Sequence, residues 1–246
     1  MADYLVFHLY GPMAAWGDIA VGEYRPSFAH PSKSAIIGLL TAALGIRRDE
    51  EEQQKNFAQA CSFAVRVDAM GTLLRDYHTI QVPSSGTGRN HRTFNTRKAE
   101  LAENNLNTIL SSRDYRCDAV YTVAITLRED APCSVKDLAE VLRKPVFTLY
   151  LGRKSCPLAF PLSPLVITAE SVKEAMTKAP VPDELQDLIH EKSSLVYWEG
   201  DQGGYEREQL ITRRDEPISR KRWQFSERKE SFSTVRREEA TPCTSA

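Results

Sequence analysis

The chain has 246 residues and a formal net charge of −1. A chain of this length can bury a substantial core, and a charge so close to zero excludes a global positive field that would hold nucleic acid non-specifically. The five cysteines are scattered and show no paired C-x-x-C spacing, which argues against a disulfide framework and a zinc site. No apolar run approaches the roughly 20 residues of a membrane-spanning helix. We therefore expect a soluble cytoplasmic protein with no cofactor and no membrane partner.

Apolar periodicity in the first 160 residues predicts alternating strands and helices. The expected strands are 4–10, 62–69, 73–82, 119–127 and 146–151. The expected helices are 34–44, which Ser32 or Ser34 can cap and Gly45 ends, a short one that ends near Ala60, and one that Ser134 and Asp137 cap and Pro145 stops. Two β-α-β halves of this kind predict an α+β, ferredoxin-like (RRM-like) domain over residues 1–160.

The periodicity weakens after residue 160. Strands are expected at 165–168, 194–199 and 209–213, with the last two paired across a turn, and a helix is expected at 170–178. We interpret residues 161–232 as a smaller β-rich domain and 233–246 as a disordered tail.

The loop before the helix at 34–44 is aromatic and basic. Its cations Arg25 and Lys33 would lie near a helix N-terminus, where backbone N–H groups favour a phosphate. A nucleotide-cradling loop fits less well, because no glycine precedes Lys33 and Pro31 removes a donor. A surface crossover with its aromatics plugged into the core remains the alternative.

Residues 83–112 break the pattern of strands and helices, and the segment 89–98 within them is basic and has no acid. Long polar stretches inside compact domains are usually functional or disordered. We interpret 83–112 as an inserted arm or projecting hairpin. Its cations, interleaved with His91 and Phe94, suit a nucleic-acid backbone with a base stacked on a ring.

The segment 150–157 (YLGRKSCP) follows the last expected strand of the first domain. Gly152 would let the backbone approach a ligand, and Arg153 could fork two phosphate oxygens. Lys154 adds a point charge and Ser155 a hydroxyl. An ordinary strand-end turn is the alternative. Cys156 has no histidine at a local spacing, so a buried structural thiol is expected there.

Two further segments carry candidate chemistry. Within 75–79, His78 with Tyr77 could perform general acid–base chemistry on a ribose hydroxyl, although a packing or stacking pair is favoured. The late basic segments 213–217 and 220–228 could contact RNA or a protein neighbour, or their charges could pair with one another on the surface.

A set of short motifs, in this order, resembles a known family. The motifs are 9–17 (LYGPMAAWG), Arg25-Pro26, 31–34 (PSKS) before 38–40 (GLL), 44–49 (LGIRRD), 74–79 (LRDYHT), 150–158 (YLGRKSCPL) and 214–217 (RDEP). Together they resemble the Cas-five subunits of type I-E CRISPR Cascade complexes, from Tyr4 to about Phe225. The arm and the chain beyond Phe225 depart from the family pattern.

The resemblance implies a non-catalytic RNA-binding subunit. Family members cap the 5′ handle of the guide RNA and contact the backbone and large subunits of Cascade, and they meet target DNA only through the complex. The arm would correspond to the family's thumb, which lies over the guide RNA. In such complexes the guide reads the target by pairing, and the protein holds RNA by its backbone and shape.

The resemblance and the residue chemistry together give one set of expected RNA-binding residues. They are Arg25, Lys33, Ser34, Arg75, Tyr77, His78, Arg89, Arg92, Arg97, Lys98, Gly152, Arg153, Lys154 and Ser155. Cations near the helix and the strand-end loop would hold handle phosphates, the serines would add hydrogen bonds, and Tyr77 and His78 would stack on or position bases. The cations of the arm would follow the guide backbone.

Two alternatives remain open. In a related CRISPR subtype the Cas-five member is itself a ribonuclease. A metal-independent endoribonuclease would use Tyr77 and His78, with Lys33 or Lys154 stabilising charge. The other alternative is an assembly wedge whose RNA contacts are incidental.

Overall fold

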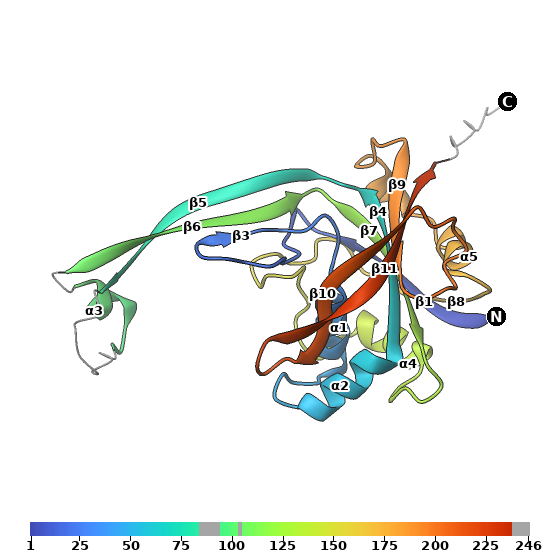
Figure 1. Ribbon diagram of the computed structural model, residues 1–246, viewed down its shortest axis with the longest axis horizontal. Coiled ribbons are helices and arrows are strands. Elements are labelled where there is room, and N and C mark those ends of the chain that lie inside the picture. Colours follow the sequence, from blue (N-terminus) through green and yellow to red (C-terminus); the bar gives the residue numbers. More distant parts are fainter. Residues whose placement is uncertain (84–93, 103–104, 238–246) are drawn as a thin grey trace.

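A computed structural model describes residues 1–83, 94–102 and 105–237 (Figure 1). These residues form two β-sheets with several short helices, so the predicted α+β class is confirmed. The larger sheet has seven strands in the order β10-β11-β9-β4-β7-β1-β8. Its strands are β1 (Ala2–Tyr10), β4 (Cys61–Ala69), β7 (Val120–Leu127), β8 (Leu165–Ala169), β9 (Ser193–Trp198), β10 (Gln209–Ser219) and β11 (Gln224–Arg236).

The smaller sheet and the helices are grouped around this large sheet. The four strands of the smaller sheet are β2 (Met13–Ala14), β3 (Tyr24–Arg25), β5 (Thr72–Pro83) and β6 (Leu106–Cys117). The helices are α1 (Lys33–Leu44), α2 (Glu51–Ala60), α3 (Arg97–Leu101), α4 (Val135–Arg143), α5 (Val172–Thr177) and α6 (Asp183–Gln186). None of the helices in the described ranges combines the length and apolarity needed to cross a membrane.

Side-chain alternation gives the large sheet a separate core on each face. Leu5 and Phe7 of β1 are fully buried in the larger core, together with apolar side chains of α1, α2 and α4. Tyr4 and Val6 point to the opposite face and are buried with Ala175 and other side chains of α5. Burying one large apolar side chain stabilises a fold by roughly 1.5–3 kcal/mol. Both faces of the central strands are therefore covered.

Helix α1 begins and ends where the sequence predicts. The Ser32 hydroxyl accepts the backbone N–H of Ala35 at 3.1 Å, so Ser32 rather than Ser34 is the N-cap. Gly45 takes the left-handed conformation at φ 80° past the last turn. The capping box of α4 between Ser134 and Asp137 is also formed.

The strand predicted at 146–151 is absent apart from one isolated bridge. The backbone N–H of Val146 donates to the carbonyl of Ala43 at 3.1 Å, near the C-terminus of α1. The last carbonyls of a helix lack intrahelical partners, so they compete with a sheet for such donors. Leu149 and Leu151 are buried in the larger core, which explains the apolar alternation without a strand.

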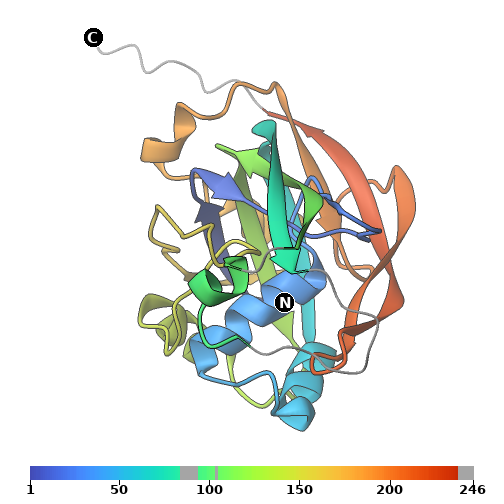
Figure 2. The same cartoon turned by 90° about the vertical axis from the view of Figure 1, so that its left-hand side faces the viewer.

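The predicted arm is present and begins earlier than expected. Strand β5 pairs with β6 from Thr72↔Cys117 to Pro83↔Leu106, so the strand predicted at 73–82 belongs to the arm and not to the main sheet. Figure 1 shows this hairpin projecting far from the body, with α3 near its tip. Figure 2 looks along the arm and shows α1 below it, with β10 and β11 at one side.

The C-terminal strands extend the main sheet instead of forming one of their own. Strand β9 pairs with β4 on one side and with β11 on the other. The predicted pairing of 194–199 with 209–213 is wrong, because β11 lies between β9 and β10. Residues 233–236 of the predicted tail continue β11, and 238–246 lie outside the described residues. The division into two domains stays a prediction, although one sheet spans its boundary.

Candidate nucleic-acid interface

A cavity of about 1250 Å³ lies beside α1 and is walled by the segment 147–154 and by β10 and β11. Six cationic side chains line it, namely Arg47, Arg48, Lys154, Arg213, Arg214 and Arg220. Three acidic residues line it, namely Asp18, Asp215 and Glu227. A concave surface with an excess of positive charge raises the local concentration of anions. The cavity thus joins Ser34, Gly152 and Lys154 with the late basic cluster, although these segments are far apart in the chain.

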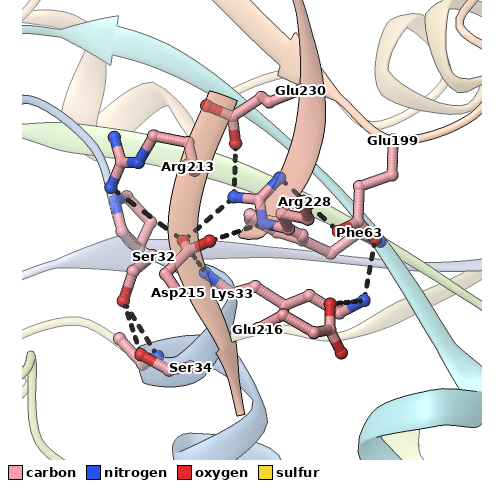
Figure 3. A network of polar contacts seen from close by, with 12 residues as sticks. Ser32, Lys33, Ser34, Phe63, Glu199, Arg213, Asp215, Glu216, Arg228 and Glu230 are labelled. Carbon is pink, nitrogen blue, oxygen red and sulfur yellow. Dashed lines mark hydrogen bonds and ion pairs between the residues drawn. The ribbon is translucent and has the colours of Figure 1, made fainter. Parts of the chain in front are cut away.

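Lys33 does not belong to this exposed set. Its ammonium lies 2.7 Å from a carboxylate oxygen of Glu216 and 3.2 Å from one of Glu199, and the residue is 7% exposed (Figure 3). Burial alone would lower the pKa of Lys33, but the two carboxylates outweigh it and the pKa is raised. The expected phosphate contact of Lys33 is corrected, because the charge is buried and already neutralised.

The N-terminus of α1 is also already occupied by an anion of the chain itself. The backbone N–H of Lys33 donates to Oδ2 of Asp215 at 2.9 Å. A carboxylate at a helix N-terminus satisfies the free donors and the macrodipole. Asp215 therefore takes the place that the sequence assigned to a phosphate. The motifs 31–34 and 214–217 meet at this contact.

Arg228 connects the same acid to β11. Its Nε and Nη2 lie 2.6 and 3.0 Å from the Asp215 carboxylate, and Nη2 lies 2.5 Å from Glu230 (Figure 3). His30 lies 3.3 Å from Glu230 on the other side. Burial alone would raise the pKa of Glu230, but His30 and Arg228 bring that pKa down to about 2. One alternative for the late basic segments was that their charges pair with one another on the surface, but Asp215 sits in a buried network.

Gly152 makes the predicted close approach, but to the protein itself. A Cβ at this position would lie 1.9 Å from the carbonyl oxygen of Ala15, and φ is +82°. Both constraints favour glycine for packing. Gly152 also lines the cavity, so its expected contact with a ligand stays a prediction. Cys156 is buried as expected, and burial raises the pKa of its thiol. Lys154 and Ser155 are exposed at the tip of this loop.

Arg153 fastens the loop to the base of the arm. Its guanidinium donates to the carbonyls of Asp114 and Arg25, both at 3.2 Å, and lies 4.7 Å from the ring centroid of Tyr115. These two bonds use two of the five N–H donors of the guanidinium, and the expected bidentate contact with a phosphate stays a prediction. Arg25 itself is exposed, and its guanidinium donates to the carbonyl of Gly22 at 2.6 Å.

A second polar cluster sits at the base of the arm, next to Arg153. Arg75 donates to Asp114 at 2.8 Å and to the Tyr24 hydroxyl at 2.8 Å. The Tyr24 hydroxyl also donates to Asp114. Hydrogen bonding to Arg75 is the main cause of a lowered pKa at Asp114. The side chain of Arg75 remains about half exposed, so the cluster presents a positioned cation to solvent.

Tyr77 and His78 do not form a pair. They are successive residues of β5, and successive side chains of a strand point to opposite faces. Tyr77 is 63% exposed, while the His78 ring lies 3.0 Å from Asp76. The expected joint action of the two side chains is therefore corrected. Within the described ranges, no group of three or more His, Cys, Asp or Glu residues is placed to hold a metal ion.

The far end of the arm is only partly described. Arg97 lies 2.6 Å from Glu100 and donates to the carbonyl of Gln81, so it attaches α3 to β5. Lys98 is exposed. Arg89 and Arg92 lie outside the described residues.

Sequence reasoning missed several cavity residues. Arg47 and Arg48 entered it only as part of the motif 44–49, and Trp223 received no role of its own. The available signal was their position, because Arg47 and Arg48 come two and three residues after Gly45, and the end of a helix fixes where the next residues emerge.

The fold and the cavity define a class of α+β protein with a projecting two-stranded arm and a cationic cavity near its base. The model of the family described as CRISPR-associated protein (Cas_Cas5) matches residues 4–230. The chain belongs to this Cas-five family, which confirms the resemblance found in the sequence.

Individual relatives agree with this family assignment. The chain is 37% identical over 170 residues to the CRISPR system Cascade subunit CasD of Escherichia coli (strain K12), which covers 66% of this chain and 70% of CasD. A chain in the solved structure of a CRISPR RNA-guided surveillance complex has a TM-score of 0.65 and 26% identity, and covers 95% of this chain and 90% of its own length. The crystal structure of a Cas protein has a TM-score of 0.59 and 24% identity, with 95% of each chain covered, and shares the fold.

Proposed function

We propose that this chain is a non-catalytic subunit of a type I-E Cascade complex that binds and caps the 5′ handle of the guide RNA. The observation that supports this most directly is the cationic cavity beside α1. Within the described residues, Lys154 and Arg214 of its lining have no acidic partner. Cations of this kind bind the phosphates of RNA and release counterions. The likeness to CasD, a Cascade subunit by name, adds to this support.

The described residues proposed to contact RNA are exposed or partly exposed. Lys154, Ser155 and Ser34 would hold the handle at the cavity, and Arg25 and Arg75 would hold it at the base of the arm. Along the arm, Tyr77 offers an exposed ring for a base, and His78, Arg97 and Lys98 would follow the guide. Arg89 and Arg92 keep the same proposed role.

The order of elements supports a ferredoxin-like core, which we include in the proposal. Strands β8, β1, β7 and β4 are adjacent and antiparallel in that order, with α1 between β1 and β4 in sequence and α4 between β7 and β8. Strand β8 then takes the place of the strand predicted at 146–151. In an RNA-recognition motif, aromatic side chains of the open sheet face stack on bases. Here α5 covers that face, so the proposed RNA site lies elsewhere.

The proposed protein partners are the backbone and large subunits of Cascade, with target DNA met through the complex. Exposed apolar side chains along the arm support a covering neighbour: Leu73, Leu74, Ile109 and Leu110 are each 38–46% exposed. Exposed apolar side chains on a projecting hairpin suit contact with a protein neighbour.

The test is co-expression with the other Cascade subunits, followed by sequencing and quantification of the RNA that co-purifies. Lys154→Ala with Arg214→Ala should lower guide retention and reduce the salt slope of binding by about one unit for each lost phosphate contact. Lys136→Ala, an exposed lysine of α4 outside the cavity, is the matched control. Unchanged retention in the double variant would favour the assembly-wedge alternative.

The endoribonuclease alternative has its own test. The chain is incubated with repeat RNA in EDTA, and specific cleavage that His78→Ala abolishes would overturn the non-catalytic proposal. The opposite orientation of Tyr77 and His78 favours no cleavage.

A further inference from the structure

Arg48 and Arg220 both line the cavity beside α1. The Nη2 atom of Arg220 donates to the carbonyl of Ser34 at 2.6 Å. Burial and the charge of Arg48 both lower the pKa of Arg220. Within the described residues neither guanidinium has an ion pair with an acid. Two uncompensated cations in one cavity favour an anion between them.

Helix α1 makes room for one of these arginines. A Cβ at Gly38 would lie 2.3 Å from Nη2 of Arg220. Glycine inside a helix is less favourable than alanine. The absence of a side chain at Gly38 leaves room for the Arg220 guanidinium, which lies against the helix and lines the cavity.

An exposed tryptophan stands beside the same cations. Trp223 is 57% exposed, whereas the other two tryptophans, Trp16 and Trp198, are 1% and 4% exposed. The Arg48 guanidinium lies 4.9 Å from the Trp223 ring centroid. Trp223 has φ +53°, which is uncommon for a bulky residue, in the turn between β10 and β11. The turn therefore holds a large aromatic surface in solvent at the cavity.

We propose that Trp223, Arg48 and Arg220 form a subsite for one nucleotide of a single-stranded RNA. The base stacks on the indole, and the adjoining phosphate binds between the two guanidinium groups. Stacking of this kind tolerates any base, because every base has a π face. The subsite rests on the proposed RNA-binding function and specifies one contact within it.

Tryptophan fluorescence of the full chain tests the subsite directly. Titration with a short oligouridylate should quench the emission saturably, because a stacked base quenches an exposed indole. Trp223→Phe should lose this quenching, since the two remaining tryptophans are buried. An oligomer of the same length without bases should bind with little quenching in the wild type.

Affinity measured separately with labelled oligouridylate completes the test. Trp223→Ala should weaken binding about tenfold, and Trp223→Phe should retain most of it. Gly38→Ala should displace Arg220 and lower the salt slope by about one unit while leaving the thermal midpoint within a few degrees. Thermal melts of each variant establish that it is folded.

Two negative results have different meanings. If RNA binds with unchanged emission and Trp223→Ala keeps full affinity, the subsite is refuted and the proposed RNA-binding function stands. If the wild-type chain and its assembled complex bind no RNA, both proposals fail.

Discussion

Replacing Lys33 with methionine separates a structural lysine from an RNA-binding one. The substitution keeps most of the apolar stem and removes the charge that neutralises Glu199 and Glu216. Removing one partner of a buried ion pair costs about 3–5 kcal/mol. Glu216 is partly exposed and can be hydrated, so we expect the lower end, about 3 kcal/mol. For a chain of this size, that corresponds to a fall in Tm of about 6–12 °C.

The loss should depend on pH in a defined direction. Burial already raises the pKa of Glu199 above its usual value of 4.5, and Lys33 opposes that rise. Without Lys33 the folded-state pKa of Glu199 rises further. At any pH above the unfolded-state pKa, the ionised Glu199 carboxylate then lowers the free energy of unfolding. The deficit of Lys33→Met is therefore largest at neutral pH and shrinks as the pH falls toward 4.5.

Lys154→Met is the matched control, because Lys154 is exposed and has no acidic partner within the described residues. Thermal and urea unfolding of both variants should show a loss only for Lys33→Met, and the salt slope of RNA binding should fall only for Lys154→Met. The reverse result, a stable Lys33→Met variant with a lower salt slope, would refute the assignment of Lys33 to the buried network.

Three further predictions concern stability. Gly152→Ala should cost more than about 2 kcal/mol in urea unfolding, since its Cβ would meet Ala15 and φ is positive, whereas Gly17→Ala, with open space around it, should be nearly neutral. Glu230 has a folded-state pKa of about 2 against 4.5 unfolded, so its contribution of about 3 kcal/mol is present above pH 4.5 and lost as the pH falls toward 2. Glu230→Gln should flatten the acid limb of a stability–pH curve over that window. Ser134→Ala should lower the urea midpoint by an amount equivalent to about 1 kcal/mol, and an unchanged midpoint would contradict the capping box.

Elements with purely local signals were predictable from the sequence. Helix α1 has its cap at Ser32 and its left-handed glycine at Gly45, and α4 has a capping box, so their ends are set within a few residues of chain. The strand predicted at 146–151 failed because its donors bind carbonyls of α1, a choice that apolar alternation does not encode. The predicted pairing of β9 with β10 was also wrong, because β11 inserts between them through long-range pairing, which local patterns do not encode.

Local sequence also fails to encode the long-range contacts of the candidate site, as two identical dipeptides show most clearly. Lys33-Ser34 begins α1 and Lys154-Ser155 stands in a loop, and the sequence assigns both lysines to phosphates. The fold brings Glu199 and Glu216 onto the first lysine and leaves the second exposed. In a chain with almost no net charge, a cation that the fold leaves exposed is more available to an anion than one that buried acids neutralise. The distribution of the acids in the fold therefore determines where such a protein can hold its RNA, and local motifs alone do not.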